Sequence, residues 1–146
     1  MKKEDFKLRV ELIKSKLEKA VDLILVVKEN FPSDIEEFKN SRLIRDAVYK
    51  EVKGIIELFI DILAIINADM HLGTPEVEDD IIFKLENKKL FSQNFFSKIK
   101  EIKKFRNILV HKYVEIDNEK AYSDIKNGLE DFDLIIEEIE KFLSKQ

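Results

Sequence analysis

The segment KKFRNILVHKY, residues 103–113, places four polar side chains among apolar residues at helical spacing. The four are Arg106, Asn107, His111 and Tyr113. A histidine gains or loses a proton near neutral pH, and a guanidinium offers a planar fork of donors to an anion. These residue types suit proton transfer beside a bound anion, so the helix that carries them has to be placed first.

On a helical wheel, the apolar residues of this region form one stripe, made up of Phe95, Ile99, Ile102, Phe105 and Leu109. Arg106 and Tyr113 fall within the stripe, whereas Asn107 and His111 lie one turn apart at its edge. Burying an unpaired guanidinium costs far more than one hydrogen bond returns. Arg106 is therefore expected to pair with a buried carboxylate, to extend its head to solvent, or to line a groove open to solvent or to a second subunit.

Each of these residues also has a purely structural interpretation. His111 could be a structural histidine that the dipole favours at a helix C-terminus. Arg106 could form an ion pair with a carboxylate of the last helix, such as Glu130 or Asp133. Tyr113 could lie at the edge of the core with its hydroxyl in water.

The composition predicts one folded domain over residues 1–146, with 45% hydrophobic and 38% charged residues. The absence of cysteine excludes disulfides and thiolate metal sites. With only two histidines, His71 and His111, no metal or other cofactor is expected. His71 stands near Gly73 at a helix end, where a capping or surface role is expected. The N-terminus mixes both charge signs and the run LILVV is far too short to span a bilayer, which predicts a soluble, cytoplasmic protein without membrane contact.

The net charge of −4 conceals an asymmetry along the chain. Between Asn87 and Tyr113 a single acid, Glu101, accompanies a set of basic residues: Lys88, Lys89, Lys98, Lys100, Lys103, Lys104, Arg106 and Lys112. The segment from Glu115 to Glu140 is strongly acidic. The basic segment is either a footprint for a polyanion or a solvated helix face laced with opposite charges.

Apolar residues recur at alternating intervals of three and four along most of the chain, and no segment alternates like a strand. The stripes run from Phe6 to Phe31, from Val48 to Ile66 and from Tyr122 to Leu143. A further helical region, in one or two pieces, is expected across Lys84 to Asn94 and leads into the central segment. This pattern predicts an all-α, antiparallel helical bundle of four to five helices.

Capping and breaking residues separate these stripes. Ser33 or Asp34 is expected to cap a short helix, SDIEEFKN, and Ser41 to cap the long helix that follows. The segment HLGTPEVEDD, residues 71–80, is expected to be a loop because it contains glycine and proline. Asp117 or Asn118 is expected to cap the last helix.

The run RNILVHKY matches an R-x(4)-H-x-Y signature and resembles HEPN-domain proteins of the HepT-like toxin group. The resemblance extends over nearly the whole chain. It includes the helix DAVYKEVKGIIELFIDILAIINAD before the motif, and the linker VEIDNEKAY with an acidic amphipathic helix after it. It implies an all-α bundle that forms a homodimer, with two copies of the motif across a shared cleft.

The resemblance also implies a metal-independent endoribonuclease in which a ribose 2′-hydroxyl attacks the adjacent phosphate. His111 would act as base or acid, and Arg106 would stabilise the charge that builds on the phosphoryl oxygens. Asn107 would orient His111 or the scissile phosphate. The RNA backbone would be held by Lys98, Lys100, Lys103, Lys104 and Lys112.

Tyr113 has a second implied role, as the acceptor of adenylylation by a cognate minimal nucleotidyltransferase, the antitoxin. A nucleotide added beside Arg106 and His111 would occupy the anion site and block the substrate. The alternative is a non-catalytic dimeric HEPN module that binds nucleotide or serves as partner and substrate of the nucleotidyltransferase. The sequence leaves the choice between enzyme and module open.

Overall fold

The computed structural model describes residues 7–111 and 115–146, and these residues form helices and no strand. The helices are α1 (Val10–Asn30), α2 (Ile35–Asn40), α3 (Arg42–Asp69), α4 (Glu78–Asn87), α5 (Gln93–His111) and α6 (Asn118–Ser144). The predicted all-α bundle is confirmed. The described residues contain six helices because the short second helix is separate and the third helical region is split into α4 and α5.

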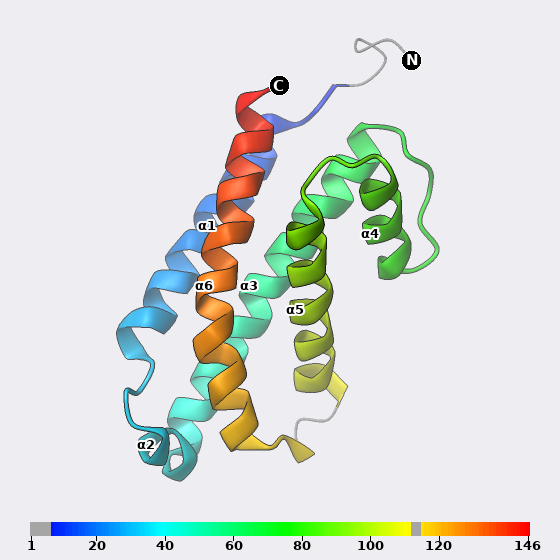
Figure 1. Ribbon diagram of the computed structural model, residues 1–146. Coiled ribbons are helices and arrows are strands. Elements are labelled where there is room, and N and C mark those ends of the chain that lie inside the picture. Colours follow the sequence, from blue (N-terminus) through cyan, green and yellow to red (C-terminus); the bar gives the residue numbers. More distant parts are fainter. Residues whose placement is uncertain (1–6, 112–114) are drawn as a thin grey trace.

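The long helices α1, α3, α5 and α6 run antiparallel in chain order, as Figure 1 shows. The short α2 lies at one end of the bundle, and α4 lies beside α5 near the other end, in contact with α3 and α5. Across the described part of the chain, no helix combines the length and the apolar character needed to cross a membrane.

Three helices begin at the capping residues that the sequence indicates. The side chains of Asp34, Ser41 and Asp117 accept hydrogen bonds from backbone N–H groups two or three residues further on, at 2.9, 3.2 and 3.1 Å. Each bond satisfies a donor that a helix start leaves without an intrahelical partner. The first stripe was expected from Phe6, which lies outside the described residues, and α1 begins at Val10.

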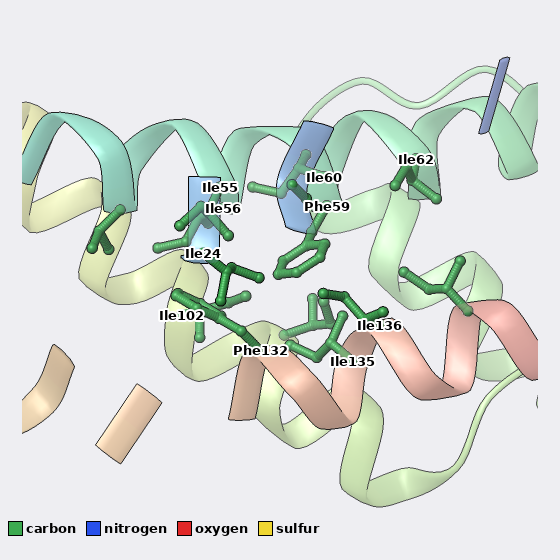
Figure 2. Packing of buried hydrophobic residues seen from close by; sticks show 14 of the residues in the cluster. Ile24, Ile55, Ile56, Phe59, Ile60, Ile62, Ile102, Phe132, Ile135 and Ile136 are labelled. Atoms are coloured by element: carbon green, nitrogen blue, oxygen red, sulfur yellow. The ribbon is translucent and has the colours of Figure 1, made fainter. Parts of the chain in front are cut away.

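The core lies where α1, α3, α5 and α6 meet (Figure 2). The ring of Phe59 on α3 is fully buried, with its centroid 5.8 Å from that of Phe132 on α6. Ile24 of α1 and Ile102 of α5 are buried in the same cluster. Because α5 contributes to this shared core, its backbone is fixed against α3 and α6, and so are the directions in which its polar side chains leave it.

The segments before and after α4 each contain residues with left-handed backbone. His71 and Lys89 have φ of 55°, and Gly73 has φ of 103°, a region where L side chains are strained. The buried side chain of Asn67 donates to the Gly73 carbonyl at 3.0 Å and so fixes the turn before α4. The expectation of a loop over the whole of residues 71–80 is wrong for residues 78–80, which form the first turn of α4.

Candidate active site at the end of α5

Two bonds of Ser92 fix the start of α5. Its hydroxyl accepts from the Phe95 backbone N–H at 3.0 Å and donates to the carboxylate of Glu138 on α6 at 2.6 Å. The face that the wheel predicts is buried at Phe95, Ile99, Ile102 and Leu109. The helix ends at His111, so Arg106, Asn107 and His111 occupy its last two turns.

Arg106 lies within the apolar stripe, as the wheel predicts, and only 11% of its side chain is exposed. Its Nη2 donates to Glu78 Oε1 of α4, and its Nε donates to Asn107 Oδ1 at 3.0 Å. The ion pair expected with the last helix is therefore wrong in its partner, because Arg106 binds a carboxylate of α4. Asp133 instead accepts from Lys28 of α1 at 2.7 Å.

The carboxylate that Arg106 binds belongs to a run of three acids in the first turn of α4: Glu78, Asp79 and Asp80. Negative side chains are favourable there because a helix N-terminus carries a partial positive charge. Asp80 Oδ2 accepts from the backbone N–H groups of Glu76 and Val77, at 2.9 and 3.4 Å. Sequence reasoning missed Glu78 and Asp79. The signal that could have found them is this acidic run, which is typical of a helix start.

Lys103 belongs to the same cluster of charges. Its Nζ lies 2.7 Å from Asp79 Oδ1 and 3.9 Å from Glu78 Oε1, and 13% of its side chain is exposed. The hydrogen bond from Lys103 and, after it, the attraction of the ammonium charge hold the pKa of the Asp79 carboxyl below its ordinary value. Two cations of α5 thus face two carboxylates of α4.

We expect this lowered pKa of Asp79 to return towards its ordinary value when Lys103→Met removes the ammonium group. Because the folded-state pKa is lowered, the pair stabilises the folded protein above the unfolded-state pKa of Asp79, and this contribution is lost as pH falls through the folded-state pKa. The contribution is small, since the Asp79 side chain is 78% exposed and solvent screens the pair. An NMR titration of the Asp79 carboxylate in both proteins measures the change, and equal pKa values would contradict the expectation.

The lysines expected to hold RNA leave α5 in different directions. Lys100 pairs with Glu86 of α4 at 3.0 Å, whereas Lys98 pairs with Asp131 of α6 at 3.3 Å. Lys104 lines both a groove between α4 and α5 and a groove between α5 and α6. Lys112 lies outside the described residues. Lys98, Lys100 and Lys103 are therefore paired with acids of neighbouring helices, the second of the two interpretations that the charge pattern left open.

Asn107 and His111 stand one turn apart at the C-terminal end of α5. Asn107 is half-buried and lines the groove between α4 and α5, and its side-chain carbonyl oxygen accepts a hydrogen bond from Arg106 Nε. His111 is exposed as the last residue of the helix. Tyr113 lies outside the described residues. His71 is exposed at the end of α3, as its expected surface role requires.

The structure thus brings Arg106, Asn107 and His111 to one helix end beside the groove that α4 forms with α5. Residues 13–139 match the model of a protein family described as "Ribonuclease HepT-like". The chain belongs to the HepT-like ribonuclease family.

Two relatives support this membership, and one further solved structure shares the fold. The mRNA nuclease HepT of Shewanella oneidensis is 30% identical over 73% of this chain and 80% of its own length. A solved structure of the tri-AMPylated Shewanella oneidensis HEPN toxin in complex with the MNT antitoxin matches with a TM-score of 0.80 and 26% identity, over 92% of this chain and 99% of the toxin. The Bacillus subtilis cytosolic protein YutE, at 18% identity, has the same HepT-like fold, with a TM-score of 0.79 over 96% of this chain and 94% of its own.

Proposed function

We propose that this HepT-like protein is the toxin of a HEPN/minimal-nucleotidyltransferase toxin–antitoxin pair and cleaves RNA without a metal ion. The observation that carries the proposal is the placement of Arg106, Asn107 and His111 within the last two turns of α5, in a chain of this family. The Shewanella oneidensis relatives support both parts, one as an mRNA nuclease and the other as a toxin bound to its MNT antitoxin.

In the proposed reaction the ribose 2′-oxygen forms a bond to the adjacent phosphorus, and the bond from phosphorus to the 5′-oxygen breaks. His111 takes the 2′-hydroxyl proton or supplies a proton to the leaving 5′-oxygen. Arg106 stabilises the negative charge on the phosphoryl oxygens. The amide group of Asn107 has its oxygen bound to Arg106, so its NH2 is the part that donates to the phosphate or to His111. The products are a 2′,3′-cyclic phosphate and a 5′-hydroxyl.

In a homodimer with two motifs across one cleft, one His111 would act as base and the other as acid. The lysines of α5 would hold the RNA backbone, and those now paired with acids would exchange a carboxylate for a phosphate on binding. The antitoxin would silence the protein by transferring AMP to Tyr113, since the added phosphate would compete for the same cations. The tri-AMPylated state of the Shewanella oneidensis toxin supports this mode of control.

The test is incubation of the purified protein with total RNA in EDTA, followed by analysis of the new RNA ends. The protein's intact mass is checked first, so that no AMP is present on Tyr113. We expect cleavage that survives chelation and leaves 2′,3′-cyclic phosphate ends, and the purified His111→Ala protein controls for contaminating nuclease. Cleavage that requires a divalent ion, or ends with 3′-hydroxyls, would contradict the mechanism.

One observation favours a second candidate, the non-catalytic module. Arg106 forms an ion pair with Glu78, and Lys98, Lys100 and Lys103 are paired with acids, so four of the charges that would meet RNA already have counter-charges within the chain. A folded, unmodified dimer that leaves RNA intact, yet accepts AMP on Tyr113 from a minimal nucleotidyltransferase, would establish this alternative.

A further inference from the structure

Within the described residues, only some of the N–H donors of the Arg106 guanidinium have an acceptor. A guanidinium has five N–H donors, and the described residues engage the donor on Nε and one on Nη2. No described residue gives an acceptor to Nη1. Two acceptors restrict how the group can turn, and the donors to which no described residue gives an acceptor can bind a planar or tetrahedral oxyanion.

Glu78 is the acceptor that brings charge to this arrangement. Arg106 is nearly buried, whereas the Glu78 side chain is 42% exposed. Asn107, as the residue next to Arg106, contributes only a neutral carbonyl oxygen. Without Glu78 the guanidinium would be buried with no counter-charge, and it would turn towards solvent.

Glu78 is itself fixed from two directions. Its backbone lies in the first turn of α4, whose entry Asp80 holds through the N–H groups of Glu76 and Val77. Lys103 lies 3.9 Å from the same Glu78 oxygen and binds the adjacent Asp79 more closely, at 2.7 Å. The position of the carboxylate is thus set by α4 and not by a flexible loop.

We propose that Glu78 is a positioning residue of the active site, which orients the Arg106 guanidinium so that its Nη1 donors are presented to the phosphoryl oxygens of RNA. This inference rests on the ribonuclease function proposed above. Glu78 touches no reacting atom, and its effect on the reaction passes through Arg106.

The experiment compares Glu78→Ala, which removes the acceptor, with Glu78→Gln, which keeps an acceptor of the same length without the charge. Asp79→Asn is the matched control, because Asp79 is the neighbouring acid and binds Lys103 instead of Arg106. Multiple-turnover cleavage of a defined RNA in EDTA gives kcat and KM, and circular dichroism checks the fold of each protein.

We expect kcat to fall about a hundredfold in Glu78→Ala and about tenfold in Glu78→Gln, because a misdirected group about 1 Å out of place costs on that order. KM should change by less than about twofold, since the lost interaction acts in the transition state. Asp79→Asn should lower kcat far less than Glu78→Ala does, and its effect should appear mainly in KM, because Asp79 binds Lys103 and not Arg106. In NMR spectra the Arg106 Nε–H signal should exchange faster with water in Glu78→Ala than in the wild type, a change that measures the hold on Arg106 without any RNA.

If the wild type is active and Glu78→Ala has an equal or higher kcat, the inference is overturned but the ribonuclease function is not. Glu78 would then have no role in the reaction or would compete with the phosphate. An equal loss of kcat in Asp79→Asn would overturn it too, since the effect would not be specific to Arg106. A folded, unmodified wild type that cleaves no RNA would overturn the ribonuclease function, and this inference with it.

Discussion

His111→Ala is expected to lower the rate of RNA cleavage by about a hundredfold to ten-thousandfold, the range in which a positioned proton donor or acceptor contributes to catalysis. The loss should appear in kcat, because the imidazole transfers a proton in the transition state and contributes little to the binding of the RNA backbone. Single-turnover cleavage of a defined RNA in EDTA measures it. A folded His111→Ala protein with the wild-type rate would remove His111 from the mechanism and leave the motif as a site of modification.

The structure separates this effect from a loss of folding. His111 is exposed and is the last residue of α5, so its replacement should change the free energy of unfolding by no more than about 0.5 kcal/mol. The matched control is the other histidine of the chain, His71, which is also exposed. Because His71 has φ of 55°, asparagine is the replacement that the backbone accepts there. His71→Asn should cleave RNA at the wild-type rate.

Phe59→Ala is expected to lower the free energy of unfolding by about 3–5 kcal/mol, a large part of the stability of a domain of this size. The ring on α3 is fully buried and packs against Phe132 of α6, so its removal would leave a cavity in the core. Urea denaturation at a fixed protein concentration measures the change. A loss below about 1 kcal/mol would mean that the surrounding helices close the cavity, and that this core is less rigid than its packing indicates.

Phe83 provides a control of the same residue type. Its side chain is 61% exposed on α4, so Phe83→Ala should alter the free energy of unfolding by about 0.5 kcal/mol or less. Comparison of the two variants isolates burial, since the chemical change is identical in both.

The helices could be predicted from the sequence because each long helix buries one apolar stripe, and a stripe is local information. The capping residues Asp34, Ser41 and Asp117 could be predicted equally well, because the side chain of a cap bonds to backbone only two or three residues away. The burial of Arg106 followed from the same wheel that placed Phe95 and its neighbours in the core.

The partner of Arg106 could not be predicted in this way. Periodicity says which face of α5 is buried but not which helix covers it, and both α4 and α6 offer carboxylates. The expectation of a loop over residues 71–80 rests on the glycine and proline of this segment. It therefore assigns no helix to the acidic run at its end and no structural position to Glu78. The partners of Lys98 and Lys100 could not be predicted for the same reason. The distribution of charges along the chain does not distinguish a lysine that pairs with α6 from one that pairs with α4.

The left-handed residue that follows α4 bears on how the protein opens in its native state. A non-glycine residue in that region costs on the order of 1 kcal/mol or more, and Lys89 has this conformation two residues after a helix of only ten residues. Short elements with little buried surface open locally well below the free energy of global unfolding. Amide hydrogens of α4 should therefore exchange with solvent before those of α3, and each such opening would release Glu78 from Arg106 while the rest of the bundle stays folded.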